Sequence, residues 1–371
     1  MKFIATTGYS LEGVLNRELK SLEMNVLDVS TSRVMFEGDH TDGCRASMML
    51  RSAGRVLLQV GSFKAINFDE LFDGTYAIQW ERIVEEGFSA AVVARSVNSA
   101  LFSQRTIQSI VQKAVFKRIC DKRRVRFVQG ETKYNIDVLI HKDIVSISID
   151  LVGKPLHMRG YRVLNSEAAL RETLAASLVL LSGWKFDRPF HDPFCGSGTI
   201  LVEAAMLARN IGPGTNRKFL YQSIPWWPKK ACQLAKEKCK DEEYTGELPP
   251  ITGADVDESV LRMAKTHIKK ANVAADISLR VENAADMTLN GDRGHIITNP
   301  PYGERMSNKK DIINTYKDFA DAYAQYPGYS CHVITSYDML ENIFRRDADK
   351  KRKLYNGNLQ TIFYQFFGKR I

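Results

Sequence analysis

The chain has 371 residues, of which 44% are hydrophobic and 26% charged, and its formal net charge at pH 7 is +9. Its length exceeds one ordinary hydrophobic core, so we expect two or three domains. No apolar run reaches the length of a membrane span, and residues 1–8 lack the hydrophobic region of a signal peptide, which argues against a membrane or secreted protein. The 6 cysteines form no CxxC pair and have no histidine partners at zinc spacing, so we expect reduced thiols in the cytoplasm and no metal site.

Residues 1–65 alternate between strand and helix patterns. Apolar residues at helical spacing predict two helices, and short apolar runs predict the strands around them. The expected strands cover 2–6, 26–30, 33–36 and 56–63, and the expected helices cover 11–22 and 40–50. Asp42 is a candidate cap for the second helix. The pattern predicts a small ferredoxin-like α/β domain with no catalytic arrangement.

Residues 66–155 form a second module. Its pattern predicts helices over 68–79, with an extension over 80–85, and 104–120, and strands over 90–96, 133–141 and 144–150. Between Arg105 and Arg162 the sequence has thirteen Lys or Arg and five Asp or Glu, which is nearly the whole positive excess of the chain. One interpretation is a solvated helix face, and the other is a surface that binds the RNA backbone. The candidate RNA-binding residues are Arg105, Lys113, Lys117, Lys122, Arg123 and Arg124.

Residues 156–371 begin with a hinge over 157–162 and a helix over 167–181, which either lies across a cofactor pocket or packs as a buried helix. From about residue 185 strands and helices alternate, which predicts a mostly parallel sheet. The aromatic and basic connection over 217–227 either faces a substrate or fastens onto a neighbouring helix. The chain ends in a predicted hairpin over 353–366 with an Asn-Gly turn.

Residues 191–200, HDPFCGSGTI, join a short strand to a helix through a glycine turn. Gly196 and Gly198 allow the backbone to approach a ligand closely, and the helix N-terminus offers free N–H groups. No Gly-Lys-Ser/Thr follows, and a leucine stands where a third glycine would be, so the turn is neither a Walker loop nor a dinucleotide GxGxxG motif. Asp192, ahead of the turn, suits a cationic or amine-bearing ligand. Cys195 is either a nucleophile or a small residue that fills the turn, and we favour the second interpretation.

Polar residues follow the next two strands. Asp255 and Asp257 end the second strand, where a doubly wound fold hydrogen-bonds the hydroxyls of a ribose. A helix cap is the alternative, and it suits Asp257 better than Asp255. Asn283 and Ala284 follow the third strand, at the place where an adenine edge would be read. These positions favour a cofactor that contains a nucleoside.

The fourth strand leads into Asn299, Pro300, Pro301 and Tyr302. The exocyclic amine of a base is a weak nucleophile, because its lone pair is delocalised into the ring. The Asn299 side-chain oxygen and the Pro300 carbonyl are placed to accept both amine hydrogens and to aim the lone pair at a methyl group. The prolines stiffen the loop, and Tyr302 offers a face on which a flipped-out base can stack. No strong base is needed, because positioning supplies most of the rate.

With these motifs the sequence resembles the bacterial THUMP-domain RNA methyltransferases that make N2-methylguanosine in large-subunit ribosomal RNA. The resemblance covers almost the whole chain and extends to residues 158–162, 170–172, 212–214 and 353–357. It implies S-adenosylmethionine as cofactor and RNA as partner. It also implies three domains in the α/β class, namely a ferredoxin-like domain (1–65), a THUMP domain (66–155) and a Rossmann-like class I methyltransferase domain (156–371). Some relatives carry a second, fused methyltransferase domain, whose activity we do not expect here.

The motifs and the resemblance together give the candidate site. The catalytic candidates are Asn299, Pro300, Pro301 and Tyr302. The cofactor-binding candidates are Asp192, Phe194, Gly196, Gly198, Thr199, Asp255, Asp257, Asn283 and Ala284. Position 283 departs from the family pattern, because Asp is commoner there.

We therefore expect an S-adenosylmethionine-dependent methyltransferase that acts on the N2 amine of a guanine in RNA, most simply large-subunit ribosomal RNA. An adenine-N6 methyltransferase acting on nucleic acid is an alternative, because Asn-Pro-Pro-Tyr serves that chemistry too. A non-catalytic RNA-binding or ribosome-assembly factor is a third hypothesis. The intact Gly196, Gly198, Asp255 and Asn299 argue against it.

Overall fold

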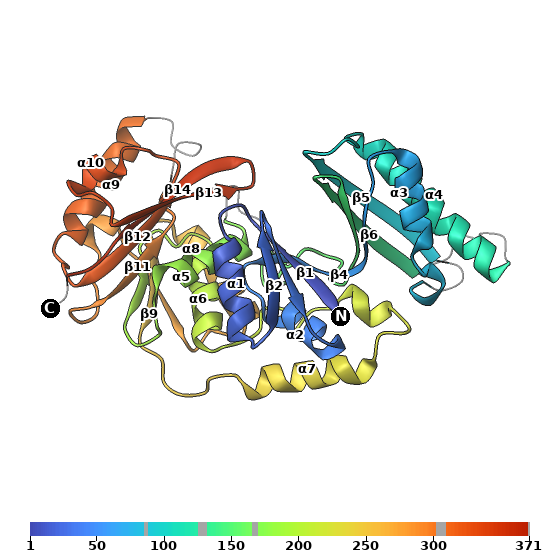
Figure 1. Ribbon diagram of the computed structural model, residues 1–371. Helices are drawn as coiled ribbons and strands as arrows, with labels where there is room; N and C mark the ends of the chain where they lie inside the picture. The colour runs from blue at the N-terminus through green and yellow to red at the C-terminus, as the bar shows by residue number, and fades with distance from the viewer. Residues whose placement is uncertain (85–87, 125–131, 165–169, 302–308, 370–371) are drawn as a thin grey trace.

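The computed structural model describes residues 1–84, 88–124, 132–164, 170–301 and 309–369. It shows three bodies in a row (Figure 1). The C-terminal body, coloured green to red, lies at one end, and the body that contains α3 and α4 lies at the other. The N-terminal body lies between them, so it contacts both.

The N-terminal body has the ferredoxin-like order of elements that the sequence predicted. These are β1 (Lys2–Thr7), α1 (Glu12–Ser21), β2 (Asn25–Ser30), β3 (Arg33–Glu37), α2 (His40–Met49) and β4 (Ala53–Lys64). The cap of α2 was wrongly predicted. Asp39 is the N-cap, because its side chain accepts from the Asp42 N–H at 3.0 Å, while Asp42 accepts from the Asp39 N–H at 2.9 Å. Asp42 thus closes a capping box from the first turn.

The second body shares a sheet with the first. Its elements are α3 (Phe68–Ala77), η1 (Trp80–Arg82), β5 (Phe88–Val97), α4 (Gln104–Arg123), β6 (Thr132–His141) and β7 (Ile144–Asp150). Strand β4, 12 residues long, pairs with β1 near its start and with β7 near its end. One seven-stranded sheet, in the order β2-β3-β1-β4-β7-β6-β5, therefore runs through both bodies. Domain boundaries near residues 65 and 155 stay predictions.

The C-terminal body is the Rossmann-like domain that the alternation of strands and helices predicted. Its strands are β8 (Phe190–Asp192), β9 (Ile251–Asp255), β10 (Ile277–Val281), β11 (Gly294–Thr298), β12 (Tyr329–Thr335), β13 (Lys350–Asn356) and β14 (Leu359–Phe366). They form a sheet in the order β10-β9-β8-β11-β12-β14-β13. The first five are parallel, and β14 runs antiparallel to both its neighbours. Gly357, at φ +63°, makes the predicted turn of the terminal hairpin.

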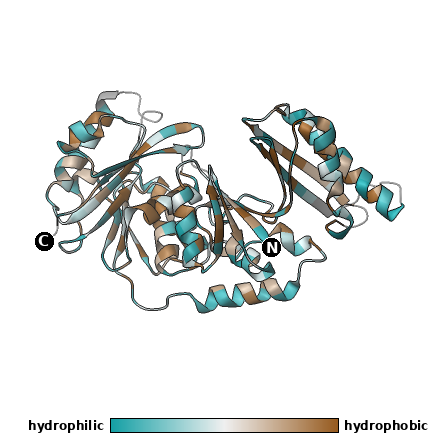
Figure 2. Ribbon diagram, in the orientation of Figure 1, coloured by the Kyte–Doolittle hydropathy of each residue, from teal (hydrophilic) through white to brown (hydrophobic). Residues whose placement is uncertain are grey.

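Helices cover both faces of this sheet, and its core is apolar (Figures 1 and 2). The covering helices are α5 (Glu172–Ser182), α6 (Thr199–Ala208), α8 (Glu258–Lys270), α9 (Lys309–Tyr323) and α10 (Leu340–Phe344), and η3 (Ala284–Asp286) is a short turn. Helix α7 (Lys229–Asp241) and the short turn η2 (Leu220–Ser223) belong to the connection that leaves this sheet. Every residue of α6 is buried, and α5 packs against it. Leu174 and Leu178 are buried in that contact, which favours the packing interpretation of α5. Residues 165–169, where we expected its start, lie outside the described residues.

The aromatic connection ahead of α7 fastens the C-terminal body to the N-terminal body. Tyr221 and Trp227 are buried in the same apolar core as residues of the first two bodies. The Trp226 indole N–H donates to the Ile83 carbonyl, and the Arg45 guanidinium pairs with Glu242 at 2.7 Å. Helix α7, mainly hydrophilic on its outer side (Figure 2), packs along α2. The fastening interpretation of residues 217–227 is therefore favoured.

Candidate active site at the switch point of the sheet

The order of the parallel strands reverses between β8 and β11. From β8 the sheet continues to β9 and β10 on one side and to β11 and β12 on the other. In an open α/β sheet, ligands bind outside the carboxyl ends of the strands at such a switch point. Asp192 ends β8, Asp255 ends β9, and Thr298 ends β11 directly before Asn299. The fold therefore gathers the strand-end residues that the sequence singled out.

The glycine turn requires glycine at two positions. Gly196 has φ +49° and Gly198 has φ +78°, which is left-handed backbone that other residues adopt only with strain. A Cβ on Gly198 would also lie 3.1 Å from the Ala264 Cβ, so the turn packs tightly on α8. The Gly196 N–H donates to Asp255 Oδ2 at 2.9 Å. This bond fixes the turn against the end of β9.

Cys195 lies inside this turn and is buried. Its N–H donates to the Ala254 carbonyl at 2.9 Å. Burial raises the pKa of its thiol well above the ordinary value, and Asp192 and Asp255 raise it further. A thiol held in its protonated form is a poor nucleophile. Cys195 therefore fills the turn, as we favoured from the sequence.

Asp192 is the most strongly perturbed carboxylate of the site. It is 1% exposed, and its Oδ1 accepts from Thr298 Oγ1 at 2.6 Å and from the Phe194 N–H at 3.2 Å. Burial raises its pKa to about 7, although both hydrogen bonds act in the opposite direction. A buried carboxyl with such a pKa stays available as a carboxylate when a cationic ligand compensates its charge.

Sequence reasoning missed Thr298. Its hydroxyl joins the end of β11 to the end of β8, 106 residues earlier. The one signal for it was a hydroxyl residue directly before the Asn-Pro-Pro string. Because Thr298 precedes Asn299, the bond to Asp192 also fixes where the Asn-Pro-Pro string begins.

The other cofactor candidates with carboxylate or amide side chains all accept hydrogen bonds from backbone N–H groups. Asp255 is half-buried, and burial raises its pKa; its Oδ1 accepts from the Asp257 N–H at 3.0 Å. Asp257 is exposed and accepts from the Ser259 N–H at 2.8 Å, which caps α8 and lowers its pKa. Asn283 likewise accepts from the Ala285 N–H at 3.1 Å and caps η3. The cap interpretation thus suits Asp257, and cofactor contacts of these residues stay predictions.

Asn299 presents an unused acceptor. Its Oδ1 is buried and has no hydrogen-bond partner among the residues that the structure describes. A buried carbonyl oxygen without a partner is costly, so such atoms in native proteins call for an explanation. Pro300 is buried, whereas Tyr302 lies outside the described residues. A substrate hydrogen would satisfy this oxygen.

Two other cofactor candidates, Phe194 and Thr199, lie at the glycine turn and at the start of α6. The Phe194 ring packs edge-on against Phe319 of α9, with centroids 5.4 Å apart. Thr199 is buried at the first turn of α6. Within the described parts of the chain, no group of three or more His, Cys, Asp or Glu residues is arranged to hold a metal ion.

The basic helix α4 lies in the body farthest from this site (Figure 1). Arg105, Lys113, Lys117, Lys122 and Arg124 are exposed on it. Lys117 is paired with Asp121 at 2.9 Å. The sixth candidate, half-buried Arg123, donates to the carbonyls of Glu81 and Val84. Arg123 therefore holds η1 in place, and the structure does not bring the basic helix together with the strand-end residues.

A glycine turn, strand-end carboxylates and an Asn-Pro-Pro string at the switch point define a class I S-adenosylmethionine-dependent methyltransferase. Comparison with known proteins agrees. The family described as RMKL-like, methyltransferase domain, matches residues 159–365, the RlmL ferredoxin-like domain matches residues 2–57, and the THUMP domain matches residues 65–150. The chain therefore belongs to the RMKL-like family of THUMP-domain RNA methyltransferases. The predicted fold class and cofactor are confirmed.

Similar proteins of known sequence cover nearly the whole chain. YpsC of Bacillus subtilis, named as a candidate RNA methyltransferase, is 37% identical over 369 residues, which are 99% of this chain and 96% of YpsC. The ribosomal RNA large subunit methyltransferase K/L of Vibrio cholerae is 32% identical over 367 residues, which are 96% of this chain and 52% of that enzyme. The chain thus spans about half the length of the K/L enzymes.

Solved structures agree in fold. A candidate methyltransferase crystallised with S-adenosylhomocysteine is 34% identical with a TM-score of 0.91 and covers 100% of this chain. A protein from Listeria monocytogenes, named by prediction as an N6-adenine-specific DNA methylase, is 38% identical with a TM-score of 0.93 and covers 99%. TrmN from Thermus thermophilus, 19% identical with a TM-score of 0.70, shares the fold. None of the described helices is both long and apolar enough to cross a membrane.

Proposed function

We propose that the protein transfers a methyl group from S-adenosylmethionine to the N2 amine of a guanine in large-subunit ribosomal RNA. The observation that carries the proposal is the buried Oδ1 of Asn299 directly after β11, which has no hydrogen-bond partner among the residues that the structure describes. The K/L relatives are named as methyltransferases of large-subunit ribosomal RNA, and this name supports the choice of substrate. We also propose that it acts in the cytoplasm, where bacterial ribosomal RNA is found.

The strand-end residues fit the cofactor. Gly196 leaves room for a close approach to the backbone of the turn, and Gly198 lets the turn pack closely on α8. Both oxygens of Asp255 already accept one N–H each, and each retains a lone pair for a ribose hydroxyl. The Asp192 carboxylate compensates positive charge, and buried Ala284 offers an apolar surface to the adenine. When bound, S-adenosylmethionine supplies an electrophilic methyl group.

The residues after β11 prepare the amine. Asn299 Oδ1 accepts one hydrogen of the exocyclic amine, and the Pro300 carbonyl accepts the other. Together they pull the nitrogen toward tetrahedral geometry and hold its lone pair in the direction of the methyl group. The fixed Thr298–Asp192 bond keeps both acceptors in place, so positioning contributes most of the rate. We propose that Tyr302 stacks on the flipped-out base.

An adenine-N6 methyltransferase is the second candidate. The same pair of acceptors suits the N6 amine of adenine, and the Listeria relative is named for that activity. The THUMP domain over residues 65–150 favours RNA over DNA as the polymer. A non-catalytic assembly factor is less consistent with a site that keeps both glycines, Asp255 and an Asn299 oxygen without a partner in the described parts of the chain.

The decisive experiment is methyl transfer from labelled S-adenosylmethionine to unmodified large-subunit ribosomal RNA, followed by nucleoside analysis by mass spectrometry. Label in N2-methylguanosine supports the proposal. Label in N6-methyladenosine would support the same mechanism with adenine, and not guanine, as the methylated base. A protein that binds S-adenosylmethionine and RNA but transfers no label would be an assembly factor.

Exposed cations of α4 are expected to add RNA affinity that depends on salt and not on sequence. Replacing Arg105, Lys113 and Lys122 by Glu is expected to weaken RNA binding about tenfold or more and to reduce the slope of log affinity against log salt by about two to three. Arg123 and Arg124 stay unchanged, because Arg123 holds two carbonyls and Arg124 has φ +54°. Fluorescence anisotropy at several salt concentrations measures both quantities.

The control replaces the same number of exposed lysines on α7 by Glu: Lys229, Lys230 and Lys236. Equal losses in the two variants would contradict a specific role for α4, because they would reflect net charge alone.

A further inference from the structure

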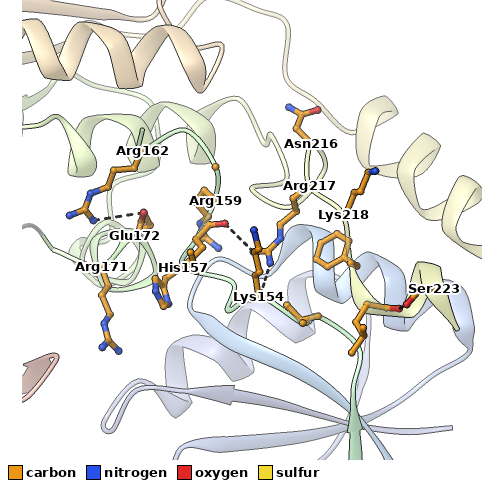
Figure 3. Close-up of a pocket in the computed structure, with 16 residues that line it drawn as sticks. Lys154, His157, Arg159, Arg162, Arg171, Glu172, Asn216, Arg217, Lys218 and Ser223 are labelled. Atoms are coloured by element: carbon orange, nitrogen blue, oxygen red, sulfur yellow. Dashed lines mark hydrogen bonds and ion pairs between the residues drawn. The ribbon is translucent and has the colours of Figure 1, made fainter. Parts of the chain in front are cut away.

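A second pocket lies where the C-terminal body meets the N-terminal body (Figure 3). Its volume is about 850 Å³. Three segments line it, namely the linker over 152–162, the first residues of α5, and residues 216–223 of the fastening connection. It is not the crevice at the carboxyl ends of β8, β9 and β11, since none of the strand-end residues lines it.

The pocket is strongly basic. Among the described residues, its lining includes one acid, Glu172, and six basic residues: Lys154, Arg159, Arg162, Arg171, Arg217 and Lys218. Some of these have structural partners. Arg159 pairs with buried Glu203 at 3.3 Å, and Arg217 donates to the Pro155 and Met158 carbonyls at 2.9 and 3.2 Å. These two guanidiniums build the wall of the pocket.

Three cations remain available to a ligand. Lys154, Arg171 and Lys218 are exposed, and none has an ion-pair partner in the described part of the chain. Figure 3 shows the basic side chains spread in a row, from Arg162 and Arg171 on one side to Lys218 on the other. A row of cations matches successive charges along a polymer better than a single small anion.

The pKa of His157, which also lines the pocket, is lowered by burial and by the same positive charges. Burial and the positive charges of Arg171, Arg159, Arg162 and Arg217 together lower its pKa to about 4. Lys154, Lys218 and Glu172 complete the charged groups of the lining. At neutral pH this ring is uncharged and can hydrogen-bond an anion, and an anion beside it would raise its pKa.

The wall of this pocket is connected to the glycine turn. The Leu164 N–H donates to His267 Nε2 at 3.3 Å, and His267 Nδ1 lies 3.1 Å from the Ser197 carbonyl. Since Nε2 accepts, Nδ1 carries the proton and donates to Ser197. Tyr161 hydroxyl donates to Glu203 of α6 at 3.0 Å. The segment that leaves the pocket is thus linked through His267 to the glycine turn.

We propose that this pocket binds the phosphodiester backbone of the substrate RNA strand beside the nucleotide that enters the active site. The proposal rests on the proposed function in so far as RNA is the substrate. Lys154, Arg171 and Lys218 contact phosphates, and His157 donates or accepts a hydrogen bond at the pocket centre. The exposed cations of α4 then bind RNA far from the active site. The pocket determines which nucleotide of the strand lies at the cofactor.

The test compares two triple variants of the full chain. One replaces Lys154, Arg171 and Lys218 by Gln, and the matched control replaces the exposed α7 residues Lys229, Lys230 and Lys236 by Gln. Unmodified large-subunit ribosomal RNA is the probe, with affinity measured against salt. The pocket variant is expected to bind about 10- to 100-fold more weakly and to lose about two units of salt slope, while the control changes little.

Cofactor binding by calorimetry shows that each variant is folded, and it should be unchanged in both. RNA binding unchanged in the pocket variant, or weakened equally in the control, would overturn the proposal. In the wild type, RNA should raise the pKa of His157 above about 4, which NMR detects. A rise with inorganic phosphate but not with RNA would assign the pocket to a small anion and overturn it. A wild type without guanine methylation would refute the proposed function alone, since this test reads binding.

Discussion

Replacing Asn299 by Ala is expected to lower methyl transfer about 100- to 1000-fold, the loss typical when one preorganised polar group is removed from a reacting centre. The amine of the base would keep one acceptor, the Pro300 carbonyl, and its lone pair would no longer be held toward the methyl group. Single-turnover transfer from labelled S-adenosylmethionine measures this step. It separates chemistry from product release.

The same substitution should leave the fold and cofactor binding intact. Asn299 Oδ1 has no hydrogen-bond partner among the described residues, so its removal leaves no described donor unsatisfied. Thermal unfolding should therefore occur at the same or a slightly higher temperature, and calorimetry should give an unchanged cofactor affinity. Full transfer activity in the variant would show that the Asn299 side chain does not hold the amine.

The strand-end residues could be predicted from the sequence because their signals are local. Gly196 and Gly198 follow a short apolar strand, and the structure gives both positive φ values. Asn299 and Pro300 stand directly after another apolar strand. Parallel strands of one sheet end at the same edge, so a local assignment of strands was enough to bring these residues together.

Contacts between distant segments could not be predicted in this way. Strand β4 was expected to close one module, yet its length of 12 residues lets it pair with β7 as well as β1. Buried Glu203 lies in α6, and it binds Arg159 and Tyr161 of the linker. No local pattern around Glu203 predicts these partners, because they lie more than 40 residues away in the sequence.

The basic surface was only partly predictable for the same reason. Charge counts place cations on α4, but they do not tell which of these side chains already bind carbonyls or carboxylates of the protein itself. Arg123 donates to two backbone carbonyls, and Lys117 pairs with Asp121. Conversely, the pocket draws Arg171 and Lys218 together from segments almost 50 residues apart, although no local charge cluster joins them.

Replacing Asp192 by Asn is expected to weaken S-adenosylmethionine binding by about 30-fold or more, because removing one member of a buried charge pair costs about 2–5 kcal/mol. The amide has the shape of the carboxyl and can still accept from Thr298, so the strand ends should stay together. Calorimetric titration with S-adenosylmethionine measures the loss. An affinity within a few-fold of wild type would show that Asp192 faces no positive charge of the cofactor.

The pH dependence tests the same residue through its proton. Burial raises the pKa of Asp192 from 3.8 to about 7, so the folded protein without cofactor binds one more proton than the unfolded chain between these values. This group therefore lowers the free energy of unfolding as pH rises from about 4 to about 7.

A cationic cofactor prefers the carboxylate, so its affinity should rise up to about tenfold per pH unit over the same range. In the Asp192→Asn protein this rise should become smaller, and the part that remains belongs to Asp255, whose pKa burial also raises. A wild-type affinity that does not change below about pH 7 would mean that Asp192 is already ionised before the cofactor binds.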